Sequence, residues 1–186
     1  MTSPASVGER EQRIRLFCAL RLPDDWLDGL VAWQQRLDLR GARRVGRDNL
    51  HVTLAFLGHR PRSDVDGVVA ALREAAADTA PPVLRVARYR ETRSVGMLVC
   101  DDEEGRAAAL ADGLHGRLER LGVFEREART WLPHVTVLRF RERPRLDPPL
   151  PELGPVSPSE AAAYLSVLRP TGAQYAVLES VALGRS

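Results

Sequence analysis

The sequence predicts an α+β protein of two related lobes, because its two halves repeat one pattern. Each half runs strand, helix, strand, at residues 15–20, 24–39 and 50–57, and then at 95–100, 105–121 and 133–140. The closing strands carry the matching tripeptides His51-Val52-Thr53 and His134-Val135-Thr136, with the histidines 83 residues apart. We therefore expect two pseudo-symmetric lobes, each an antiparallel sheet with helices on the outside, and a cleft between them.

The individual elements follow from the spacing of apolar residues. Residues 15–20 alternate as in a strand and stop before Pro23. Leu27 and Leu30 begin a helical stripe that Gly41 ends, and the leucines of residues 105–121 form another that Gly122 ends. The remaining prediction is a helix from Val65, strands at 83–90, 163–169 and 174–183, and a proline-rich surface loop at 142–159.

Length and composition favour one globular unit. We interpret the polar residues 1–12 as a disordered tail, and residues 13–186 as a single bilobal domain. No stretch approaches the roughly 18 apolar residues of a membrane helix. Cys18 and Cys100 lie in apolar runs, which is typical of reduced core cysteines in a cytoplasmic protein. We expect a cytoplasmic monomer that does not contact a membrane.

The charge of the chain says less about its ligand than the repeat does. All 27 basic residues are arginine, and the formal net charge is +2. This permits contact with a phosphate but lacks the broad basic footprint of a protein that binds duplex nucleic acid. Arg40, Arg43, Arg44 and Arg47 precede the first tripeptide and could line a groove for an RNA backbone, or could simply be solvated loop residues.

The paired tripeptides are the candidate site. Alternation in a strand turns His51 and Thr53 to one face and their aliphatic neighbours to the other, and the same holds for His134 and Thr136. Two histidines across a cleft suit the opening of a cyclic phosphate. One takes a proton from water while the other protonates the departing oxygen, and threonine hydroxyls can hold the phosphate.

Other uses of histidine are less well supported. One histidine in a strand is usually structural, but matching pairs at matching places in a repeat favour function. His59 and His115 are interpreted as surface or boundary residues. The sequence has no His-Glu-x-x-His or Cys-x-x-Cys spacing and no glycine-rich phosphate loop, so we expect no metal and no nucleotide cofactor.

At these residues the sequence resembles the two-histidine (2H) phosphoesterases, and specifically their bacterial and archaeal RNA 2′,3′-cyclic phosphodiesterase (2′-5′ RNA ligase) branch. The resemblance extends over residues 13–183. The matching stretches are RLFCALRLP from Arg15, NLHVTLAFLG from Asn49, PHVTVLR from Pro133 and GAQY from Gly172.

The resemblance implies hydrolysis of the 2′,3′-cyclic phosphate end of an RNA, or of a small cyclic nucleotide, to a 2′-phosphate. It implies His51 as proton donor, His134 as proton acceptor, and Thr53, Thr136 and Arg139 as phosphate-binding residues. Strand parity places Arg139 on the face opposite His134, so its role requires a bulge or a strand end. Cys18 follows Phe17 where the family often has an aromatic residue, and the aromatic usual before the first motif is also missing.

Three alternatives remain open on the sequence. The same site could join RNA ends as a 2′-5′ RNA ligase. It could open a small cyclic phosphate such as ADP-ribose 1″,2″-cyclic phosphate. It could also be a non-catalytic module that binds RNA ends, although a pure binder has no need of two titrating histidines.

Overall fold

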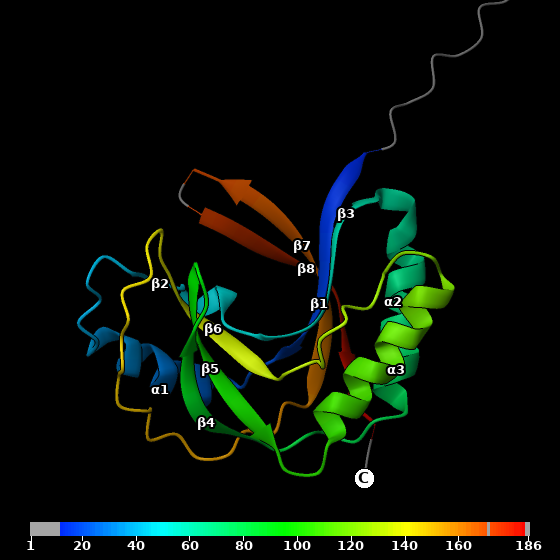
Figure 1. Ribbon diagram of the computed structural model, residues 1–186. Coiled ribbons are helices and arrows are strands. Elements are labelled where there is room, and N and C mark those ends of the chain that lie inside the picture. The colour runs from blue at the N-terminus through cyan, green and yellow to red at the C-terminus, as the bar shows by residue number, and fades with distance from the viewer. Residues whose placement is uncertain (1–11, 171, 185–186) are drawn as a thin grey trace, which may run out of the picture.

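The computed structural model describes residues 12–170 and 172–184, which form an eight-stranded antiparallel sheet flanked by helices (Figure 1). The strands are β1 (Arg13–Arg21), β2 (Arg43–Arg44), β3 (Val52–Pro61), β4 (Leu84–Glu91), β5 (Val95–Asp102), β6 (His134–Arg139), β7 (Glu160–Arg169) and β8 (Gly172–Ala182). The helices are α1 (Asp24–Gln35), α2 (Val65–Ala77) and α3 (Arg106–Arg120), with 3-10 turns η1 (Arg47–Asn49) and η2 (Arg62–Asp64). The expected tail, residues 1–12, lies outside the described residues apart from Gln12.

The sheet has an internal two-fold arrangement centred between β3 and β6. Its strand order is β4-β5-β6-β3-β1-β7-β8, with β2 beside β6. Outwards from the centre, β6 matches β3, β5 matches β1, and β4 matches β7. The ladder between β3 and β6 consists of the pair Val52–Val135, so the two halves meet at one narrow crossing. The predicted α+β fold of two antiparallel lobes is confirmed, and this pair joins their sheets into one.

The helices of the two repeats are exchanged between the halves. Figure 1 shows α2 and α3 side by side along one flank of the molecule and α1 at the opposite end. Helix α1 of the first repeat reaches the second repeat, where Gln34 Nε2 donates to the carbonyl of Val137 on β6 at 2.7 Å. Helix α3 of the second repeat packs against β3, where His115 Nε2 lies 2.7 Å from the carbonyl of Leu54. Each histidine-bearing strand is therefore held by a buried polar side chain from the other repeat.

The two faces of the sheet are packed differently. Val52, Val135 and the leucines of the helices belong to one large core. On the other face a small separate cluster contains Phe17 and Tyr164 with two alanines, and Tyr175 packs against it. One face of the central strands is therefore committed to the core, which leaves the other face for a site.

Most predicted elements are confirmed, with shifted ends. Helix α1 stops at Gln35, short of the expected end at residue 39, and Arg44 fills the space beyond it. The Arg44 guanidinium donates to the last carbonyls of the helix, at 2.8 Å for Gln34 and 3.3 Å for Gln35. Strand β2, which holds Arg44, was not predicted, because two arginines carry no apolar alternation. Residues 142–159 have no helix or named strand, as expected.

Two further expectations concern membrane helices and thiols. Within the described residues, no helix combines the length and apolar character needed to cross a membrane. Cys18 and Cys100 are both buried and free. Burial raises the pKa of each thiol to about 12, so both stay protonated and unreactive at neutral pH.

The exchanged helix contact predicts a stability effect at Gln34. Gln34 is 1% exposed and donates to the carbonyls of Val45 and Val137. Gln34→Leu should lower the free energy of unfolding by about 1–3 kcal/mol, because the Val45 carbonyl loses this partner in the core. Urea denaturation measures the change, with the exposed neighbour substitution Gln35→Leu as the matched control. Equal stability of the two variants would show that this hydrogen bond does not hold α1 to β6.

Candidate active site

The two His–Thr pairs lie where β3 and β6 cross. Val52 and Val135 face each other there and are fully buried. Extending this antiparallel register by one residue each way sets each histidine opposite the threonine of the other strand. Neighbours of a buried strand residue point to the other face, so four polar side chains share one side. We call this side the histidine face, and it carries His51, Thr53, His134 and Thr136.

Backbone hydrogen bonds orient both imidazole rings in the same way. His134 Nδ1 lies 2.8 Å from the carbonyl oxygen of Leu132, two residues upstream. A carbonyl can only accept, so Nδ1 carries the hydrogen. His51 has the corresponding backbone bond with Asn49, and its Nε2 lies 3.1 Å from the Thr53 hydroxyl. Nε2 is therefore the nitrogen of each ring that can exchange a proton with a ligand.

Aromatic residues surround one histidine. Phe17 of β1 stacks on the His51 ring at 5.0 Å between centroids, and Tyr175 of β8 meets it edge-on at 5.5 Å. Tyr164 of β7 stacks on Phe17 at 4.8 Å. These tyrosines were not predicted as site residues, since they lie more than a hundred residues from His51 in sequence. They provide an aromatic surface beside His51, although the position after Phe17, where the family often has an aromatic residue, is Cys18.

This packing controls the charge of His51. Burial lowers the pKa of His51 to about 4, an effect that the backbone hydrogen bond with Asn49 opposes. The charges of His134 and Arg139 lower it further, which means that both groups are close enough to act on His51. His51 is therefore neutral at pH 7 in the free protein.

A β-bulge brings Arg139 to the histidine face. Two consecutive residues of β5 pair with Thr136 and Leu138, which leaves Val137 as an extra residue on β6. Val137 and Leu138 are both buried, whereas Arg139 is exposed. The bulge places Arg139 on the same face as Thr136. This position is consistent with the effect of the Arg139 charge on the pKa of His51. The structure thus contains the irregularity on which the predicted role of Arg139 depended.

The arginine-rich approach to the first motif is mostly structural. Arg44 binds carbonyls of α1, Arg47 forms ion pairs of 2.7 and 2.9 Å with two aspartates of α1, and Arg40 lies 3.5 Å from an aspartate. Arg43 differs. It is paired in register with Arg139, and no hydrogen bond or ion pair of its side chain occurs among the described residues. The four arginines do not form one groove lining.

The remaining histidines have separate positions. His59 is exposed near the end of β3. His115 is buried in α3, with its ring bonded to the Leu54 carbonyl and packed 4.7 Å from Phe124. His115 is therefore a core residue and not a boundary residue as expected. Nowhere in residues 12–170 and 172–184 do three or more His, Cys, Asp or Glu side chains gather as metal ligands would.

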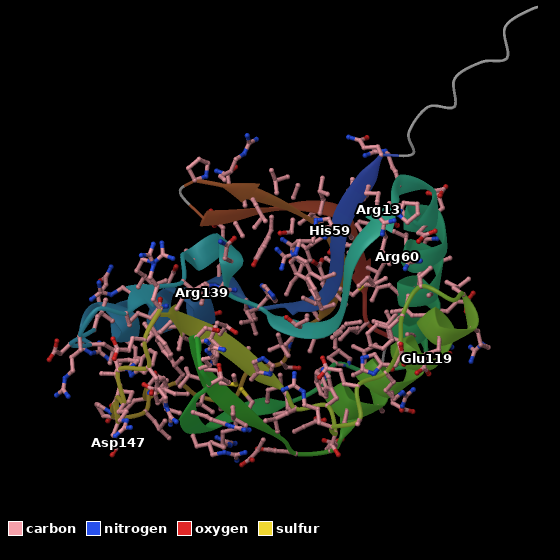
Figure 2. All side chains as sticks on the ribbon, turned by 45° about the horizontal axis from the view of Figure 1, so that its top comes forward. Arg13, His59, Arg60, Glu119, Arg139 and Asp147 are labelled. Atoms are coloured by element: carbon pink, nitrogen blue, oxygen red, sulfur yellow. The ribbon has the colours of Figure 1, made fainter. Side chains whose placement is uncertain are left out.

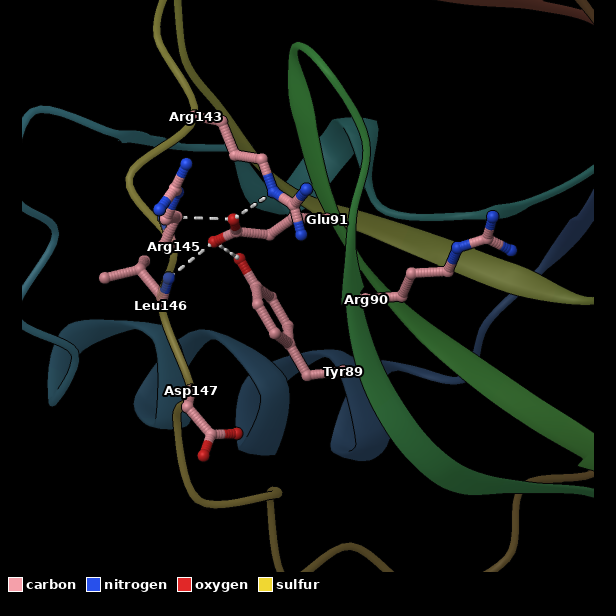
Figure 3. Close-up of a pocket in the computed structure, with 7 residues that line it drawn as sticks. All are labelled: Tyr89, Arg90, Glu91, Arg143, Arg145, Leu146 and Asp147. Carbon is pink, nitrogen blue, oxygen red and sulfur yellow. Dashed lines mark hydrogen bonds and ion pairs between the residues drawn. The ribbon is translucent and has the colours of Figure 1, made fainter.

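A hollow of about 520 Å³ lies beside the β4–β5 hairpin, and none of the His–Thr residues lines it (Figure 3). Its buried carboxylate, Glu91, accepts hydrogen bonds from Tyr89, from the Arg143 side chain and from the backbone N–H groups of Arg145 and Leu146. The carboxylate is fully satisfied by these four donors and fixes the following loop. The hollow is a structural junction, so the histidine face remains the candidate site. Figure 2 shows how Arg139, near that face, lies apart from Asp147 of the hollow.

Known proteins share this architecture and part of its sequence. A family model described as LigT-like phosphoesterase matches residues 20–94. A curated relative, the RNA 2′,3′-cyclic phosphodiesterase of Thermus thermophilus, is 32% identical over an alignment of 182 residues, which covers 91% of this chain and 90% of the relative. The chain belongs to the LigT-like phosphoesterase family. It is accordingly an enzyme, a phosphoesterase, and the resemblance of the chain to the 2H phosphoesterases is confirmed.

Solved structures of other proteins have the same fold. Escherichia coli LigT in complex with 3′-AMP superimposes with a TM-score of 0.79 at 24% identity, covering 94% of this chain and all of LigT. TT0787 of Thermus thermophilus gives a TM-score of 0.74 at 29% identity, covering 93% of this chain and all of TT0787. The exchanged helices and crossing strands are therefore part of a fold seen in solved structures.

The state of His51 gives a prediction for the LigT-like site. In the free protein, the His51 imidazole should titrate at about pH 4 because of its burial. Inorganic phosphate should raise that value by stabilising the imidazolium ion. NMR titration of the imidazole carbon–proton signals, assigned with His51→Gln, measures both values. Titration near the ordinary value of about 6.5, unchanged by phosphate, would contradict both the burial of His51 and the binding of phosphate beside it.

Proposed function

We propose that this phosphoesterase hydrolyses the 2′,3′-cyclic phosphate ends of RNA to 2′-phosphates, with His51 and His134 as its acid/base pair and without a metal. The observation that carries the proposal is the placement of two His–Thr pairs opposite each other on one face. The relative named RNA 2′,3′-cyclic phosphodiesterase supports the substrate class. The 3′-AMP complex of LigT supports a nucleotide-sized ligand.

The chemical step needs one proton acceptor and one donor. His134 Nε2 takes a proton from water as the water oxygen bonds to phosphorus. The bond between phosphorus and the ribose 3′ oxygen breaks in line with this attack, and His51 Nε2–H protonates the departing oxygen. The product has a 2′-phosphate and a 3′-hydroxyl. Nδ1 of each ring stays bonded to the backbone, which keeps Nε2 aimed at the phosphate.

Three residues hold the phosphate. The hydroxyls of Thr53 and Thr136 donate to its non-bridging oxygens from opposite strands. Arg139 supplies a guanidinium, which stabilises the charge that develops on these oxygens in the transition state. Tyr175 and Phe17 offer ring surface beside His51, where the base or ribose can pack.

The low pKa of His51 becomes useful once substrate binds. A neutral His51 in the free site cannot donate a proton. The negative charge of the cyclic phosphate stabilises the imidazolium ion, so the phosphate raises the pKa and His51 enters the reaction protonated. Binding of the cyclic phosphate therefore protonates His51, the residue that must donate a proton in the reaction.

We propose hydrolysis and not 2′-5′ ligation, although the same groups could catalyse both. The name of the Thermus thermophilus relative supports this choice. We place the reaction in the cytoplasm, where buried thiols such as Cys18 and Cys100 remain reduced. We propose that the chain acts as a monomer with one bilobal domain, residues 13–186.

Single substitutions of the histidines test the acid/base pair. His51→Ala and His134→Ala should each lower kcat about 10²–10⁴-fold on a 2′,3′-cyclic-phosphate oligoribonucleotide in EDTA. His59→Ala, which removes an exposed histidine away from the site, is the matched control and should keep wild-type kcat. Product masses and ³¹P NMR identify the 2′-phosphate.

Two results would contradict this proposal. Near-full activity of either His51→Ala or His134→Ala, with the protein folded, would remove that residue from proton transfer. Loss of wild-type activity in EDTA, restored by a divalent cation, would show that a metal takes part.

A further inference from the structure

Strand β4 carries arginines on the same face as the site. The ladders β6–β5 and β5–β4 define two rows of residues that cross the sheet from the site. The first row is His134, Val99 and Arg88, and the second row is Thr136, Met97 and Arg90. Residues directly opposite in neighbouring strands share a face. Arg88 and Arg90 therefore extend the histidine face by two strands.

Burial supports this assignment. Leu98 and Cys100 belong to the main core, whereas the alternating residues Met97 and Val99 are buried outside it. Figure 3 shows Arg90 on the far side of the hairpin from the Glu91 cluster, with its guanidinium directed away from it. The β4 arginines thus extend from the face opposite the core.

The charges of these two arginines are not neutralised. Arg88 and Arg90 are exposed, and neither forms a hydrogen bond, ion pair or ring contact with any described residue. Arg85 of the same strand, in contrast, pairs with Glu103 at 3.0 Å. The nearest carboxylate on this face of β5 is Asp101, which is in register with Arg85 and not with the other two. Unpaired guanidinium groups beside a phosphate site suit a second anion.

We propose that Arg88 and Arg90 bind the backbone phosphates of a single-stranded RNA whose cyclic end lies between the two histidines. This inference rests on the proposed function and adds the path of the RNA chain. Two strand spacings, about 10 Å in all, separate β4 from β6, and a short single-stranded RNA can span this distance. The RNA path therefore crosses β5 toward β4, away from the Arg40–Arg47 segment.

The test compares a cyclic mononucleotide with a tetranucleotide that ends in a 2′,3′-cyclic phosphate. The double variant R88Q/R90Q should raise KM for the tetranucleotide roughly five- to thirtyfold, with kcat and the mononucleotide kinetics unchanged. The slope of log(kcat/KM) against log[salt] for the tetranucleotide should become shallower by about 1.4, since two phosphate contacts are lost. Affinity for the 2′-phosphate-ended product, by fluorescence anisotropy, should fall by the same factor without any turnover.

The control R36Q/R120Q removes the same charge from two exposed arginines elsewhere and should behave as wild type. Equal effects of the two double variants would overturn the proposal, as would equal effects on mononucleotide and tetranucleotide. A loss seen with R43Q, beside Arg139, but not with R88Q/R90Q would place the RNA path on β2 instead. Failure of wild type to open either cyclic substrate would reject the proposed function alone, because anisotropy still tests RNA binding.

Discussion

The pairing of Val52 with Val135 is the constraint on which the site depends. This pair joins the two half-sheets, and its burial decides which way every neighbouring side chain points. A slip of one residue in a strand exchanges its two faces. It would bury a histidine and expose a valine, at the cost of packing in the core. The hydrophobic core therefore fixes the position of the polar groups above it, and the exchanged helices hold both strands in this register.

The two halves share a framework but differ in chemistry. Phe56 of β3 and Arg139 of β6 each lie five residues after the histidine of their own His–Thr pair, and both are exposed. One half adds Phe17 and two tyrosines around its histidine, and the other adds the arginines of β4. Pseudo-symmetry thus places two similar imidazoles on one face. In the proposed function the aromatic half suits a base, and the cationic half suits an RNA backbone.

Much of this could be predicted from sequence, because repeat, alternation and motif are local signals. The fold class, the paired tripeptides and the shared face of each His–Thr pair needed only residue order. The bulge at Val137 could not be predicted, since both it and Leu138 are apolar and fit regular alternation equally well. The tyrosines of β7 and β8 and the arginines of β4 reach the site through strand pairing between distant segments. Arg43 and Arg44 are adjacent and identical in type, so sequence could not show that only Arg44 binds the last carbonyls of α1.

The central claim is that both imidazoles contact one phosphate from opposite sides. A crystal structure with uridine 2′,3′-cyclic vanadate, an analogue of the five-coordinate transition state, tests this most directly. We expect His51 Nε2 and His134 Nε2 within hydrogen-bond distance of the two apical oxygens, with the hydroxyls of Thr53 and Thr136 on equatorial oxygens. Vanadate held by one histidine only, or bound in the hollow beside Arg143, would contradict it.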